Sequence, residues 1–86
     1  MSDHPSRYTG TDFCGHVRGL IEAGIPGSVA EVAGGGGHYT IAVTAAAFSG
    51  KSMLEQQRMV YGIINELLRG EDAPIHAVDK LTTRVK

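Results

Sequence analysis

A long helical segment lies between two strand-like segments in the second half of the chain, and this arrangement restricts the folds open to it. The segment from Ser52 to Gly70 has a helical pattern, and Ser52 with Glu55 forms a capping box at its start. Its apolar residues recur at helical spacing: Met53, Leu54, Val60, Tyr61, Ile64, Leu67 and Leu68. A strand is predicted from Ile75 to Leu81. A helix between two strands is the crossover that allows them to pair in parallel, with a right-handed connection.

The first half of the chain contributes another helix. The segment from Thr11 to Gly24 carries apolar residues at positions i, i+4, i+7 and i+8, namely Phe13, Val17, Leu20 and Ile21. Residues 1–10 are polar and aperiodic, so we expect a flexible leader followed by a single domain of residues 11–86.

Two short strands follow the first helix. Residues 28–33 form the first, and His38 to Thr44 alternates between apolar and polar side chains as a second. The four glycines from Gly34 to Gly37 connect them, and we expect a flexible loop longer than a tight two-residue turn. The predicted element order is therefore helix, strand, strand, helix, strand. It indicates an α+β fold, an α-β-β-α-β sandwich with both helices on one face of a three-stranded sheet.

The composition is that of an ordinary small globular protein. Of 86 residues, 42% are hydrophobic and 20% are charged, and no apolar run approaches the ~18 residues of a membrane span. The N-terminus lacks the apolar stretch of a signal peptide, and a single cysteine agrees with a reducing compartment, so we expect a cytoplasmic protein. The net charge of −1 provides no global basic field for nucleic acid.

Two histidines are the candidate chemical groups. His38 follows the four glycines and His76 stands at the start of the last predicted strand, so the two can meet if their strands are neighbours. Neutral imidazole binds iron, copper and zinc, but a full site needs about four donors, so a partner protein or a small thiol would supply the rest. The structural alternative is that His76 hydrogen-bonds across the sheet and that His38 is merely solvated.

Other reactive side chains are assigned no role. Cys14 lies on the first helix, where we interpret it as a small, partly buried residue held away from the hairpin loop. Gly50-Lys51-Ser52 imitates the end of a phosphate-binding loop, but the required earlier glycine is replaced by Ala45. No nucleophile with a neighbouring base is recognisable, so we do not expect an enzyme.

Three motifs in order carry a family resemblance. Phe48-Ser-Gly-Lys-Ser, Gln56-Gln57-Arg58 with Val60-Tyr61-Gly62, and Ile75-His76-Ala77-Val78 resemble the BolA family, and Gly37-His38-Tyr39 in the hairpin fits it too. The resemblance covers roughly residues 12–81. It implies a fold similar to type II KH domains and an adaptor that partners a monothiol glutaredoxin, with its glutathione, in [2Fe-2S] cluster binding, trafficking or iron sensing.

The same resemblance implies the ligands. His76 matches a cluster ligand of the family and His38 matches a second one from the hairpin, so the [2Fe-2S] cluster would be shared with the partner and not held alone. Two departures are visible. Gln56-Gln57 replaces a segment in which many members carry a histidine, which indicates a Gln-Gln subgroup. The chain also ends Leu-Thr-Thr-Arg-Val-Lys, so the short terminal helix common in the family is not expected.

A KH-like, nucleic-acid-binding transcriptional regulator of the stress or morphology type is the alternative, with DNA as its partner. KH domains contact single strands through a Gly-x-x-Gly loop, and here Gly50-Lys51-Ser52-Met53 lacks the second glycine. A basic strip including Lys51, Arg58 and Lys80 could still bind phosphates, and that binding should weaken steeply with salt.

Overall fold

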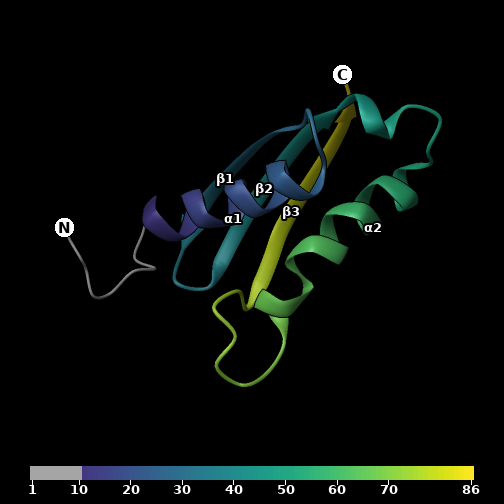
Figure 1. Ribbon diagram of the computed structural model, residues 1–86. Coiled ribbons are helices and arrows are strands. Elements are labelled where there is room, and N and C mark those ends of the chain that lie inside the picture. The colour runs from purple at the N-terminus through teal and green to yellow at the C-terminus, as the bar shows by residue number, and fades with distance from the viewer. Residues whose placement is uncertain (1–10) are drawn as a thin grey trace.

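The computed structural model describes residues 11–86 in two layers (Figure 1). The expected leader, residues 1–10, lies outside the described residues. The elements follow the predicted order: α1 (Thr11–Gly24), β1 (Val29–Gly35), β2 (His38–Ala45), the 3₁₀ turn η1 (Ala46–Phe48), α2 (Met53–Ile64), the 3₁₀ turn η2 (Asn65–Leu68) and β3 (Ala77–Val85). Among the described residues, no helix is long and apolar enough to cross a membrane.

The sheet has the order β1-β2-β3, so β2 is the central strand. β1 pairs with β2 in antiparallel orientation, and β2 pairs with β3 in parallel orientation. The predicted hairpin and the predicted parallel pair across the second helix are both confirmed. This topology brings the start of β2 and the start of β3 to the same end of the sheet.

Both helices cover one face of this sheet. Along β2, Tyr39, Ile41 and Val43 are buried, whereas His38, which precedes Tyr39, and Thr40, which follows it, are exposed. The helices contribute buried residues to the same core, namely Phe13, Val17 and Ile21 from α1 and Val60 and Ile64 from α2. Figure 1 shows both helices on the same side of the sheet, with α2 beside β3. The core is therefore one-sided, and no helix within residues 11–86 covers the opposite face of the sheet, called the outer face below.

The hairpin differs from the expected loop. Gly34 and Gly35 belong to β1 and pair with Tyr39 and His38, so only Gly36 and Gly37 form the turn. Both have positive φ, +62° and +90°, as the central residues of a tight type I′ turn require. The prediction of a longer, flexible loop is wrong. Gly34 and Gly35 have no side chains that could show a strand pattern in the sequence, but their backbone groups still pair with β2.

The last strand is displaced relative to the prediction. It begins at Ala77 and continues to Val85, where the prediction placed residues 75–81. The polar tail pairs with the central strand through Arg84 opposite Thr44 and Val85 opposite Ala45. Thr83 is buried in this extension, so the backbone pairing and one hydroxyl anchor a segment whose side chains are mostly polar.

The helix α2 begins as predicted and ends earlier than predicted. The Ser52 hydroxyl accepts the Glu55 N–H at 3.1 Å, and Glu55 Oε1 accepts the Ser52 N–H at 2.9 Å, which completes the capping box. The α-helix stops at Ile64 and continues only as the 3₁₀ turn η2. The predicted apolar stripe is correct in part, since Val60 and Ile64 are buried. Three of its members are exposed: Met53, Leu54 and Tyr61.

The capping box gives a first prediction. Ser52→Ala should lower the free energy of unfolding by about 1 kcal/mol, because the Glu55 N–H loses the hydroxyl that accepts it. The other bond of the box, from the Ser52 backbone N–H to the Glu55 carboxylate, remains in Ser52→Ala. It lowers the pKa of Glu55, so its contribution is present above pH 4.5 and is lost as the pH falls through the lowered pKa. Urea unfolding at pH 7 and below pH 4 should therefore show a similar difference between the two proteins at both pH values. An unchanged free energy of unfolding in Ser52→Ala at pH 7 would contradict the role of the hydroxyl.

Candidate functional site

The two candidate histidines lie at one end of the sheet. His38 is the Cα partner of Ala77, the residue after His76, and the Gly37 carbonyl accepts the N–H groups of both His76 at 2.8 Å and Ala77 at 3.0 Å. Figure 1 places the β1–β2 turn and the start of β3 at the same end. The two histidines therefore lie on neighbouring strands at one end of the sheet, with His38 opposite the residue that follows His76.

His76 is positioned by packing against the hairpin turn. A Cβ atom added at Gly37 would lie 2.8 Å from both Cγ and Nδ1 of His76, so the imidazole occupies the space that the missing side chain leaves. Gly37 is buried while His76 remains exposed. The imidazole makes no hydrogen bond or ion pair with any other residue of the described range 11–86, so hydrogen bonding across the sheet does not account for its position.

His38 is positioned by a different contact. Its Nδ1 atom lies 3.3 Å from Oδ1 of Asp79 on β3. The side chains are 60% and 54% exposed, so this pair faces solvent on the outer face. His38 is therefore exposed, as expected if it were merely solvated, but its imidazole also contacts Asp79.

Asp79 lies in a β-bulge and was not recognised from the sequence. Val78 pairs with Tyr39 and Lys80 with Thr40, which leaves Asp79 as the extra residue on β3. Bulges redirect side chains and are frequent beside functional sites. The sequence contained one signal: Val78 and Leu81 both pack against the core, yet they are three positions apart instead of two.

The donor set at this end is incomplete for a metal centre. No group of three or more His, Cys, Asp or Glu side chains within residues 11–86 is arranged to hold a metal ion. Two exposed imidazoles fit half of a [2Fe-2S] ligand set, for which the remaining donors come from another molecule. They do not fit a cluster that this chain holds alone.

Cys14 lies closer to the hairpin than predicted. Its Sγ atom is 3.8 Å from the carbonyl oxygen of Gly34, near the end of β1, because α1 runs along that strand. The prediction that helix placement keeps Cys14 away from the hairpin is wrong. Its burial agrees with the prediction, and Gly34 pairs with the core-facing Tyr39, whereas His38 faces the outer side. The thiol and the His38 imidazole therefore lie on opposite faces of the sheet.

The predicted basic strip is divided between the two layers. Lys80 lies on the outer face, paired with the exposed Thr40. Lys51 precedes α2 and Arg58 lies on it, in the helical layer that covers the other face. Of the further cations in the strip, Arg69 pairs with Glu66 at 2.9 Å. The sheet thus separates Lys80 from Lys51 and Arg58.

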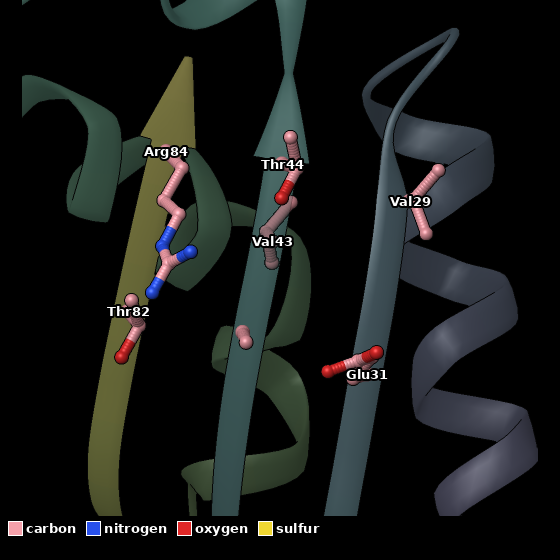
Figure 2. Close-up of a pocket in the computed structure, with 7 residues that line it drawn as sticks. Val29, Glu31, Val43, Thr44, Thr82 and Arg84 are labelled. Atoms are coloured by element: carbon pink, nitrogen blue, oxygen red, sulfur yellow. The ribbon is translucent and has the colours of Figure 1, made fainter. Parts of the chain in front are cut away.

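A shallow hollow of about 310 Å³ lies on the outer face, beside the C-terminal half of β3 (Figure 2). Glu31 and Val29 on β1 and Arg84 and Thr82 on β3 border it, while Figure 2 shows the helices behind the sheet. This hollow is a trough between exposed side chains of three strands. It lies several residues along β2 from His38, so it is not part of the histidine site.

Comparisons with known proteins agree with the fold and the motif order. The family model described as BolA-like protein matches residues 23–85. The structure of BolA1 from Mus musculus superposes with a TM-score of 0.65 at 26% identity, covering 98% of this chain and 73% of that protein. The structure of the XC975 protein superposes with a TM-score of 0.60 at 32% identity, covering 99% and 95%. No curated protein matches the sequence. The family match spans most of the chain, and the chain therefore belongs to the BolA-like family.

Proposed function

We propose that this protein is an adaptor that forms a complex with a monothiol glutaredoxin and shares a [2Fe-2S] cluster with it. One observation carries the proposal: two exposed imidazoles lie at one end of the sheet, and the described residues around them do not complete a ligand set. The partner and its glutathione would supply thiolates, which are the usual iron-sulfur ligands. Such a complex serves cluster trafficking or iron sensing rather than catalysis.

His76 and His38 would hold the cluster from this side. When bound, a cluster with imidazole ligands supplies one-electron chemistry at a higher potential than one with thiolates alone. His76 has no competing partner among residues 11–86, and its ring is supported by the turn, so its nitrogen remains available to a metal. His38 keeps Nε2 available, because its contact with Asp79 uses Nδ1.

Reconstitution of the complex tests the proposal. The cluster is assembled with purified monothiol glutaredoxin, glutathione and either the wild-type protein, His76→Ala or His38→Ala, and visible absorption and circular dichroism are recorded. We expect the spectrum of the mixed complex to be lost in His76→Ala and altered in His38→Ala. His16→Ala, which removes an imidazole from α1, serves as the control and should leave the spectrum unchanged. A wild-type spectrum in His76→Ala would exclude its role as a ligand.

Nucleic-acid binding is not favoured by the arrangement of charges. Lys80 faces away from the layer that holds Lys51 and Arg58, so one strand of nucleic acid would have to pass around the sheet edge to contact all three. The alternative predicts salt-sensitive mobility shifts with single-stranded DNA at low salt. The proposed adaptor predicts none at low micromolar protein.

A further inference from the structure

We propose that Asp79 is a positioning residue that holds His38 in the Nδ1–H tautomer and thereby leaves the Nε2 lone pair free for the metal. This inference rests on the proposed function, because it concerns how one of the two imidazoles is presented to the cluster. It begins with the 3.3 Å contact between His38 Nδ1 and Asp79 Oδ1. An ionised carboxylate accepts hydrogen bonds and cannot donate them, so the contact requires a proton on Nδ1.

The tautomer matters because a neutral imidazole has only one nitrogen with a free lone pair. The hydrogen bond at one ring nitrogen determines which nitrogen that is. Metal-binding histidines usually donate their other N–H group to a carboxylate or a carbonyl, and loss of that acceptor typically weakens metal binding 10- to 100-fold. Asp79 is such an acceptor for the Nδ1–H group of His38, and Nε2 is then the atom that would bind the metal.

The backbone is arranged to make this contact. His38 is the first residue of β2 and Asp79 is the extra residue of the bulge on β3. In a regular ladder Asp79 would be the partner of Thr40, two positions beyond His38 on β2 and on the same face of the sheet. In the bulge Asp79 has no Cα partner, its carboxylate lies beside the imidazole, and the pairing resumes at Lys80.

The contact contributes little to folding. Both side chains are more than half exposed, and ion pairs between solvent-exposed groups typically add little to stability. The two imidazole rings are oriented in different ways. The ring of His76 is fixed by packing on Gly37, whereas the exposed ring of His38 needs a hydrogen bond to orient it. A bulge that orients an exposed imidazole at small cost in stability fits a role in presenting a ligand.

Nitrogen-detected correlation NMR of the imidazoles decides the tautomer in the chain without metal. The spectra are recorded in alkaline solution, where the neutral imidazole is the species compared. We expect the Nδ1–H tautomer at His38 in the wild type and in Asp79→Asn, whose side-chain oxygen still accepts the proton. Asp79→Ala should shift His38 toward the Nε2–H tautomer, which free imidazole side chains prefer in water. Lys80→Ala, which removes the neighbouring charge without removing the acceptor, should keep the wild-type tautomer.

The consequence for the metal is measured on the complex with glutaredoxin. Asp79→Ala should lose the cluster to a chelator 10- to 100-fold more readily than the wild type, Asp79→Asn should largely retain it, and the thermal midpoint of the free chain should hardly change. An Nε2–H tautomer in the wild type, or equal cluster retention in Asp79→Ala, would overturn the role of Asp79. Failure of the wild-type complex to form any cluster would instead overturn the proposed function, and the tautomer measurement on the free chain separates these two results.

Discussion

Gly37→Ala should displace the imidazole of His76 and destabilise the protein, whereas Gly36→Ala should only destabilise it. Both glycines have positive φ, +90° and +62°, so alanine at either position should cost about 1–3 kcal/mol of backbone strain. At Gly37 the added Cβ would also lie 2.8 Å from two ring atoms of His76, while at Gly36 nothing lies within 4 Å. The ring of His76 must therefore move in Gly37→Ala.

Thermal unfolding and the imidazole NMR signals of His76 measure the two effects separately. For a domain of this size 1 kcal/mol corresponds to roughly 4–8 °C in the midpoint, and Gly37→Ala should be the less stable of the two variants. The His76 signals should shift in Gly37→Ala and stay near their wild-type positions in Gly36→Ala. If the proposed function is correct, the cluster of the glutaredoxin complex should be weakened mainly by Gly37→Ala. Unshifted His76 signals in Gly37→Ala would contradict the packing of this ring against the turn.

The fold was predictable because its main signals are periodic. Alternation in His38 to Thr44 places Tyr39, Ile41 and Val43 in the core, and the helical spacing of Val60 and Ile64 buries α2 on the same face. The errors lie where backbone pairing, not side-chain pattern, determines structure. Gly34 and Gly35 extend β1 through their backbone groups alone, and residues 82–85 extend β3 beside the central strand although they are mostly polar.

The site was predictable only as far as topology determines it. A hairpin followed by a parallel crossover brings His38 and His76 to one end of the sheet, and that proximity was expected. The partner of His38 was not expected, because the pairing register of the last strand, which brings Asp79 near His38, does not follow from the sequence pattern alone. The position of Cys14 near Gly34 depends on how α1 lies along β1, which helical periodicity alone does not determine.

Gln56→Leu should be strongly destabilising, because Gln56 is a buried polar residue whose amide is hydrogen-bonded at both ends. The side chain of Gln56 is only 7% exposed, and both ends of its amide are used. Nε2 donates to the Lys51 carbonyl at 2.9 Å, and Oε1 accepts the Thr83 hydroxyl proton at 2.7 Å. Leucine would leave the buried Thr83 hydroxyl with only the Met53 sulfur, 3.2 Å away, and would remove the donor from the Lys51 carbonyl. We therefore expect a loss of about 2 kcal/mol and a midpoint lower by roughly 8–16 °C.

The adjacent glutamine supplies the matched control. Gln57 is half-buried and its side chain makes no hydrogen bond with another residue of the described chain, so Gln57→Leu should change stability by no more than about 0.5 kcal/mol. Equal losses for Gln56→Leu and Gln57→Leu would contradict the network. The double variant Gln56→Leu/Thr83→Val should lose less than the sum of its two single changes, because Thr83 no longer has a buried hydroxyl to satisfy. The hydrogen bond between Gln56 and Thr83 connects α2 to the C-terminal part of β3, so the loss measured in Gln56→Leu reports on the contact between these two elements.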